Sequence, residues 1–314
     1  MAGLLLFLGA GASFECGLPL GVNLLLEIHQ QASQPGNAHP IRQIGHERQW
    51  DPPAEEQLKI IRADAWNSGF TSIDRFVKER PAVAPAAKVL LARVLRDAEY
   101  RSKVDRGNGW YDYFWSRASD SIREGREAVK VITLNYDRTL EEYLIRRSLS
   151  AFGWNRDRAR RAQETAVSIL HLHGSLGALD EVEYMRSTAT DPWSDAARAA
   201  ERIVTLGEDI PTAYIEAGNL LRRADVIAFL GTSFPSEVMD NLFLDVENWK
   251  RVRKGREERG MEHAHVYSST KDVRAGEWTR TRSRYLRHLS DLVLPHVTED
   301  HDCLATLRNF TILP

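Results

Sequence analysis

The 314-residue chain has little of what marks a secreted, zinc-binding or membrane-spanning protein. Its two cysteines, Cys16 and Cys303, are too few for a disulfide framework, and neither lies in the C-x-x-C pair of a cysteine-rich zinc site. We therefore expect a reducing, cytoplasmic setting. The N-terminal apolar run is too short to span a bilayer and leads into glycines rather than a cleavage site, so we expect neither a targeting signal nor a membrane partner.

An excess of charge of one sign is also missing. The 42 basic and 44 acidic residues leave a formal net charge of -2. The overall charge therefore requires no nucleic acid, anionic membrane or acidic substrate, and any such partner has to be recognised locally. Hydrophobic residues make up 43% of the chain, enough to bury a large core as one α/β domain.

Short apolar runs alternate with helical periodicity along most of the chain. Runs of strand length lie at residues 4–8, 129–134, 168–172, 203–206, 225–230 and 264–267. Segments with helical periodicity lie between most of them, for example 140–148 and 211–224. This alternation predicts an α/β fold with a Rossmann-like, doubly wound parallel sheet. The active crevice is then expected at the carboxyl ends of the strands.

One long segment, from about residue 31 to residue 128, breaks this alternation. It has the periodicity of several helices after a loop that contains proline and glycine, and we interpret it as a helical insertion in a single domain over residues 1–314. Its aromatic cluster at residues 110–115 favours a core role over a ligand cage. A second helical or loop segment is expected at residues 150–166.

The first expected strand ends in LFLGAGAS. Gly9 and Gly11, with Ala10 between them, allow a sharp turn and close approach to a phosphate, and a helix after Ser13 would point its amides at that anion. An ordinary strand-to-helix turn explains this loop about as well. Phe14 stands where a G-x-G-x-x-G motif has its third glycine, which argues against the usual hydride-transfer loop.

Polar side chains follow the next expected strand, in VITLNYDRTLEEYL. Asn135 and Asp137 are two residues apart and therefore share a face at the crevice. Capping of the following helix would explain Asp137 equally well but leaves Asn135 unexplained.

Two histidines mark a third strand end, in SILHLHGSLG. His171 and His173 are two residues apart, so we expect both side chains on the same face of the strand. Gly174 would leave space beside His173. No carboxylate or cysteine nearby in sequence completes a metal site, so we expect no metal and treat His173 as a candidate acid or base.

The fourth strand end, in DVIAFLGTSFP, carries Gly231, Thr232 and Ser233. Small hydroxyl side chains beside a glycine can donate hydrogen bonds to phosphate or ribose oxygens. The alternative is a strand-to-helix turn with a serine N-cap.

Together, these motifs resemble those of the sirtuin (silent information regulator) family. GAGAS at 9–13 with GLP at 17–19, TLNYD at 133–137, HG at 173–174 and GTS at 231–233 occur in the order of that family. SIDRF at 72–76 and IVTLGED at 203–209 resemble its divergent prokaryotic branch. The resemblance implies a modified Rossmann domain that binds NAD in an extended pose and cleaves its nicotinamide–ribose bond.

The resemblance also implies a role for each motif. The loop from Gly9 to Ser13 is similar to the diphosphate site, and Thr232 and Ser233 to the opposite wall of the dinucleotide groove. Asn135 resembles the residue that positions the attacking group or the ribose, and Asp137 the carboxylate near the nicotinamide amide. His173 resembles the general base that engages the ribose hydroxyls.

The chain also departs from the deacylases of this family. Those enzymes carry four cysteines on a zinc-binding module after the HG motif, whereas residues 175–224 contain none. Where the deacylases have G-I-P-D-F-R, residues 17–22 read GLPLGV and lose the phenylalanine and arginine that close over the cofactor. Both departures favour water as the acceptor.

We therefore expect an NAD glycohydrolase, that is, an NAD nucleosidase, that uses NAD as its substrate and gives nicotinamide and ADP-ribose without a metal. Related prokaryotic domains imply a regulated, NAD-depleting effector of anti-phage defence. Because no sensor module is fused to the chain, we expect a homo-oligomer, a partner such as a HerA-like ring ATPase or an Argonaute-type protein, or both.

Other functions remain open from the sequence. The first is an NAD-dependent protein deacylase, and the second is a noncatalytic NAD-sensing subunit, which would need neither Asn135 nor His173. The third is a nucleic-acid-acting enzyme, motivated by the basic, tryptophan-containing segments 249–260 and 274–289. Acidic residues interrupt both segments, which favours a solvated helix face or a subunit interface.

Overall fold

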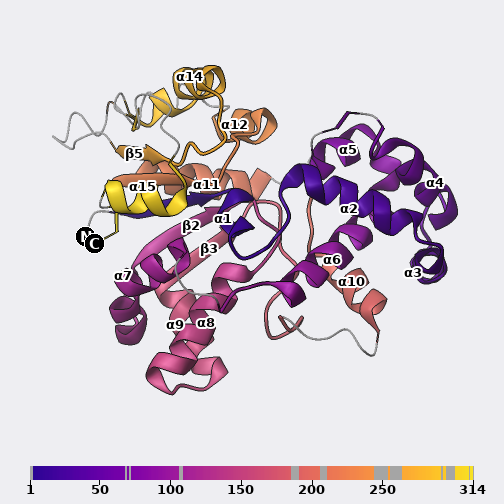
Figure 1. Cartoon of the computed structure of the whole chain (residues 1–314), viewed down its shortest axis with the longest axis horizontal. Coiled ribbons are helices and arrows are strands. Elements are labelled where there is room, and N and C mark those ends of the chain that lie inside the picture. Colours follow the sequence, from indigo (N-terminus) through magenta and orange to yellow (C-terminus); the bar gives the residue numbers. More distant parts are fainter. Residues whose placement is uncertain are drawn as a thin grey trace.

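The structure is a computed structural model. It describes residues 3–67, 69–70, 72–105, 109–184, 191–205, 211–243, 254, 264–290, 293–294, 301–310 and 312–313. Figure 1 shows a sheet covered by helices, with a second group of helices to one side of it. Within these ranges, no helix has the length and apolar character needed to cross a membrane.

The described residues contain one six-stranded, wholly parallel sheet with the order β3-β2-β1-β4-β5-β6. Its strands are β1 (Leu4–Leu8), β2 (Val129–Thr133), β3 (Val167–His171), β4 (Val226–Leu230), β5 (His265–Ser268) and β6 (Val293–Leu294). This order confirms the predicted Rossmann-like, doubly wound α/β fold. The strand order reverses between β1 and β4, which is where such sheets bind ligands, at the carboxyl ends of the strands.

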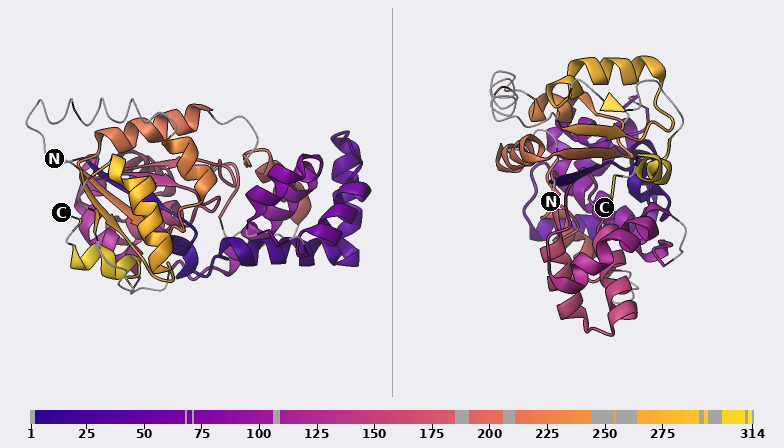
Figure 2. Two further views of the ribbon diagram at one scale, coloured as in Figure 1. Left: turned by 90° about the horizontal axis from the view of Figure 1, so that it is seen from above. Right: turned by 90° about the vertical axis from the view of Figure 1, so that its left-hand side faces the viewer.

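The central strand β1 is apolar at every position because helices cover both faces of the sheet (Figure 2). Leu6 and Leu8 face a core shared with α7 (Trp110–Glu124), α8 (Thr139–Phe152), α9 (Arg156–Ala166) and α15 (Cys303–Asn309). Leu5 and Phe7 face the opposite core, shared with α11 (Pro211–Arg223), α12 (Ser236–Leu242) and α14 (Ala275–Arg284). The aromatic residues of α7 belong to the first of these cores, with Trp110 and Phe114 each 1% exposed.

A helical lobe lies beside the sheet (Figures 1 and 2). It consists of α2 (Gly21–Ser33), α3 (Ala38–Glu47), α4 (Ala54–Asp64), α5 (Ile73–Glu79), α6 (Ala84–Arg101) and α10 (Pro192–Ala200). These helices share a core of their own that includes Ile28, Leu58, Phe76 and Leu90. Although α10 follows β3 in the chain, it packs along α6, so the chain returns to the lobe after β3.

Side-chain caps fix where several helices begin. Ser72 accepts a hydrogen bond from the amide of Arg75 at the start of α5, Asn155 accepts one from Arg158 at the start of α9, and Asp191 accepts two at the start of α10. Each oxygen satisfies an amide that has no partner within its own helix. The segment expected as helix or loop at 150–166 is thereby divided into the end of α8 and all of α9.

The prediction of a strand at residues 203–206 is wrong for residues 203–205, which are the part that the structure describes. Ile203 makes only an isolated antiparallel bridge with Gly174. The chain is still turning out of α10 at this point, because the Ile203 amide donates to Ala200 O at 3.3 Å. Residue 206 lies outside the described residues. The two-residue strand β6, in contrast, was not expected from the sequence.

A buried ion pair connects the lobe to the sheet. Arg138 Nη2, just after β2, lies 2.6 Å from Glu99 Oε2 on α6, and the two side chains are 2% and 1% exposed. The Arg138 guanidinium also donates to the carbonyls of Gly177 and Val182, which follow β3. We propose on this basis that lobe and sheet fold as one domain over residues 1–314, with the lobe as an insertion.

Arg138→Met should lower the free energy of unfolding by about 3–5 kcal/mol, because it leaves the Glu99 carboxylate buried without its cation. Urea unfolding followed by circular dichroism measures this change. Arg123→Met is the matched control, since Arg123 pairs with Asp120 where the side chains are 56% and 75% exposed, and a loss below about 1 kcal/mol is expected there. Equal losses in the two variants would contradict the role given to Arg138.

Candidate active site

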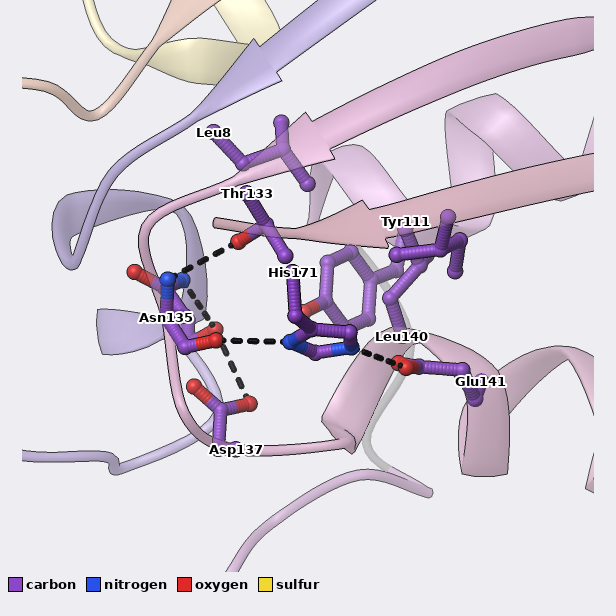
Figure 3. Close-up of a pocket in the computed structure, with 10 residues that line it drawn as sticks. Leu8, Tyr111, Thr133, Asn135, Asp137, Leu140, Glu141 and His171 are labelled. Carbon is purple, nitrogen blue, oxygen red and sulfur yellow. Dashed lines mark hydrogen bonds and ion pairs between the residues drawn. The ribbon is translucent and has the colours of Figure 1, made fainter. Parts of the chain in front are cut away.

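A small pocket lies at the carboxyl ends of β1, β2 and β3, close to the point where the strand order reverses (Figure 3). The register places Thr133 beside both Leu8 and His171, so the three strand ends form one row. The pocket measures about 220 Å³, a volume that includes space open to solvent. It is lined by Leu8, Ser13, Tyr111, Thr133, Asn135, Asp137, Leu140, Glu141, Ile169 and His171.

The loop that carries Gly9, Ala10 and Gly11 packs directly against the loop after β4. The Gly11 amide donates to Gly231 O at 2.9 Å, and the Gly9 amide donates to Leu230 O at 2.9 Å. A Cβ on Gly9 would lie 2.6 Å from Gly231 O, and Gly231 itself has a φ of +62°, so glycine is required by the contact between the loops. The first and fourth motifs therefore form one structural unit.

The helix expected after Ser13 differs from the prediction. Helix α1 is the four-residue segment Gly11–Phe14, which contains Ser13, and the next helix, α2, begins only at Gly21. The Ala12 and Ser13 amides donate to Gly9 O and Ala10 O. These amides close the turn, because the chain has to reverse within a few residues to bring the loop against Gly231.

Asn135 joins the glycine loop to the end of β2. Its Nδ2 donates to Gly9 O and to Ser13 Oγ, at 3.1 Å in both cases, and its amide donates to Thr133 Oγ1 at 3.0 Å. The Ser13 hydroxyl in turn donates to Asp137 Oδ1 at 3.2 Å. The structure thus brings Ser13, Asn135 and Asp137 together in one pocket.

Asp137 both accepts from the first amide of the following helix and lies at the pocket, the two roles considered from the sequence. Its Oδ1 accepts from the amide of Thr139, the first residue of α8, at 3.1 Å, and it also faces the pocket through Ser13. Burial raises the pKa of the Asp137 carboxyl, and the hydrogen bonds from Thr139 and Ser13 oppose that rise.

The two histidines do not share a face, contrary to the prediction. His171 is the last residue of β3 and lines the pocket, whereas His173 lies in the turn that follows and contacts α11. Alternation of side chains requires strand geometry, and pairing with β2 ends at His171. Among the described residues, no group of three or more histidine, cysteine or acidic side chains is arranged to hold a metal ion.

His173 is 3% exposed and is held from two sides. Its Nε2 lies 3.0 Å from the hydroxyl of Tyr214 on α11, and its carbonyl accepts from the Val204 amide at 2.9 Å. Burial lowers the pKa of His173, partly opposed by the charge of Asp74. The lowered pKa favours the neutral imidazole, which is the form that a general base requires.

Thr232 and Ser233 have different environments. Thr232 is buried, and its hydroxyl accepts from the Phe234 amide at 3.1 Å, so it stabilises the turn after β4. Ser233 is exposed. The Gly231 amide donates to Ser269 Oγ, after β5, at 2.7 Å.

Two pocket residues, Glu141 and Tyr111, and the His173 partner Tyr214 were not predicted from the sequence as site residues. Glu141 lies in the first turn of α8, four residues after Asp137, and its closeness in sequence to Asp137 could have indicated it. Tyr111 comes from α7 and packs beside Ser13, and no motif marks it. Tyr214 is on α11 and belongs to no motif. Most of the IVTLGED motif, residues 206–209, lies outside the described residues.

The basic segments considered for nucleic-acid binding give no stacking surface where they are described. Trp278 and Tyr285 are 1% and 6% exposed and belong to the core under α14. Arg284 pairs with Asp240 at 2.8 Å. Of residues 249–260, only Lys254 is described.

Comparison with known families agrees with this site. A model of the SIR2-like domain matches residues 129–286, half of the chain. The chain belongs to the SIR2-like family. SIR2-like domains bind NAD and are generally NAD-dependent enzymes, so an NAD-related activity is supported. No curated protein matches the chain significantly.

The matched region of this SIR2-like chain includes Asn135, Asp137, His173 and the loop at Gly231. The glycine loop at residues 9–13 precedes the matched region and reaches the site through its contacts with Asn135 and Gly231.

Gly231→Ala should abolish NAD binding and lower stability, because its Cβ would lie 2.1 Å from the Ala12 amide nitrogen. Calorimetric titration with NAD, with and without candidate partner proteins, measures the first effect, and thermal unfolding measures the second. Gly276→Ala on α14 is the control, because a Cβ there meets nothing within 4 Å. NAD affinity unchanged in Gly231→Ala would show that the contact between the two loops is dispensable for the site.

Proposed function

We propose that this chain is an NAD glycohydrolase that cleaves the nicotinamide–ribose bond and transfers ADP-ribose to water. The observation that carries the proposal is the position of Asn135, whose side chain bonds Gly9 and Ser13 of the glycine loop beside Asp137. A fixed amide at this place can orient a water molecule or a ribose hydroxyl without reorganising during the reaction.

In the proposed reaction, the bond between the ribose C1′ and the nicotinamide nitrogen breaks, and its electron pair stays on that nitrogen. Neutral nicotinamide leaves, and positive charge develops on the ribose. A water oxygen, oriented by Asn135, attacks C1′ and loses a proton. Neutral His173, acting through the ribose hydroxyls, is the base that we propose for this proton, and Asp137 orients the nicotinamide amide.

The pocket supports a regulated enzyme. Ser13, Asn135 and Asp137 in its lining are already hydrogen-bonded to one another, so in this proposal a dinucleotide enters only when this network opens. We propose that the site opens when the chain self-assembles or binds a partner such as a HerA-like ring ATPase or an Argonaute-type protein. In this proposal the chain is a cytoplasmic effector of anti-phage defence that depletes NAD.

Asn135→Ala and His173→Ala should each lower the rate of NAD cleavage by about 10²–10⁴-fold, measured as nicotinamide and ADP-ribose by chromatography, with and without candidate partners. His39→Ala, an exposed position on the helical lobe, is the control and should keep the wild-type rate. Product formation that survives both site variants would refute the assignment. Turnover only with an acylated peptide would instead indicate a deacylase.

Tyr214→Phe should raise the basal rate by about two- to tenfold, because it removes one hydrogen bond of about 0.5–1.5 kcal/mol that occupies His173 Nε2. Steady-state kinetics measures this rate, and Tyr100→Phe, an exposed tyrosine on α6, should leave it unchanged. A lower rate in Tyr214→Phe would contradict the view that Tyr214 blocks His173.

A further inference from the structure

His171 has an oxygen acceptor at each ring nitrogen. Nδ1 lies 2.8 Å from the backbone carbonyl of Asn135, and Nε2 lies 2.7 Å from Glu141 Oε1 on α8 (Figure 3). A carbonyl oxygen and a carboxylate can only accept hydrogen bonds. A neutral imidazole carries one N–H and would place a lone pair against one of these oxygens. Both contacts are satisfied only by the doubly protonated imidazolium.

The other groups around His171 fit this charge. Its side chain is 13% exposed and that of Glu141 is 16% exposed, so water screens the pair only in part. Asp137, in the loop before α8, adds a second nearby carboxyl, and Ser13 and Tyr111 contribute hydroxyls from α1 and α7. Burial lowers the pKa of His171, but Glu141 and the Asn135 carbonyl outweigh it and raise the pKa above its ordinary value.

We propose that Glu141 and the Asn135 carbonyl hold His171 as an imidazolium, and that His171 is a positioning residue that fixes Asn135 for NAD cleavage. The part that concerns cleavage rests on the proposed function. Asn135 is anchored through its amide by Thr133, through its side chain by Gly9 and Ser13, and through its carbonyl by His171. Only the last anchor carries a proton that titrates near neutral pH.

Stability and the rate of NAD cleavage should both depend on the protonation of His171. Since the pKa of His171 is raised in the folded protein, its contribution to stability is complete below the unfolded value of about 6.5 and is lost as pH rises through the folded value. The rate of NAD cleavage should fall over that same alkaline range, because the Asn135 carbonyl or Glu141 then loses its donor. His173, whose pKa is lowered, limits the rate on the acid side instead.

Nuclear magnetic resonance with ¹⁵N-labelled protein tests the charge without any assay of activity. The His171 ring signals, assigned with His171→Asn, should change from those of an imidazolium only at a pH above the ordinary value of about 6.5. The Asn135 side-chain NH₂ signals, assigned with Asn135→Ala, should shift with pH in step with them. The proposal would be overturned if His171 titrates at or below about pH 6.5. It would also be overturned if the Asn135 signals do not change as His171 titrates, even if the chain cleaves NAD.

Kinetics tests the positioning role with a graded pair of variants. Glu141→Gln lets neutral His171 keep both contacts, since a glutamine amide can donate to Nε2, so the alkaline fall of the rate should disappear whatever the absolute rate of this variant. His171→Asn loses the contact with Glu141, and its kcat should drop by about 10–100-fold with less change in KM, as for other groups that orient a site residue. Glu164→Gln is the matched control, because Glu164 is exposed on α9, away from the pocket, and pairs there with the half-buried Arg160.

An alkaline fall that is identical in wild type and Glu141→Gln would overturn the proposal. Absence of NAD cleavage in every variant and in wild type, with each candidate partner, would refute the proposed function. The resonance titrations of His171 and Asn135 would still decide whether the imidazolium fixes Asn135.

Discussion

The arrangement of this molecule depends on the Arg138 guanidinium. Arg138 immediately follows Asp137, and its charge is neutralised by Glu99 on the helical lobe while its other donors satisfy the carbonyls of Gly177 and Val182. A cation buried this deeply is tolerated only when its donors are paired. The pairing fixes three parts of the chain relative to one another: the end of β2, helix α6, and the segment that follows the HG motif.

Much of the fold could be predicted because a doubly covered parallel sheet leaves a plain signal. Residues 4–8 and 226–230 are apolar without interruption, since β1 and β4 are buried on both faces. Residues 129–133 are mainly apolar and are interrupted by Lys130, which is only partly buried, and by Thr133. The same signal misled at residues 203–206, where Ile203 is buried as the chain leaves α10 rather than in a ladder. Burial selects apolar residues whether or not they pair, so an apolar run alone cannot separate the two cases.

The site residues that could be predicted are those whose positions follow from the order of the strands in the sheet. Asn135 and Asp137 come directly after a strand next to β1, so their approach to the glycine loop follows from the strand order. The separation of His171 from His173 does not, because it depends on the residue at which pairing with β2 ends. Nor could Tyr111 or Tyr214 be found, since they reach the site from helices whose packing no local pattern specifies. The role of each histidine was therefore determined by structure that the motif itself does not contain.

The route of the chain between the two halves of the sheet has a mechanical consequence. After His173, the carbonyl of Gly177 accepts a hydrogen bond from Arg138, and α10 then packs along α6 in the lobe. After α10, the Val204 amide donates to the His173 carbonyl, before β4 begins. The backbone before this histidine is therefore held in the sheet by β3, and the backbone after it is held by Arg138 and by helix α10 of the lobe. Any displacement of α10 with the lobe would therefore move Val204, and with it the donor to the His173 carbonyl, without a ligand entering the crevice.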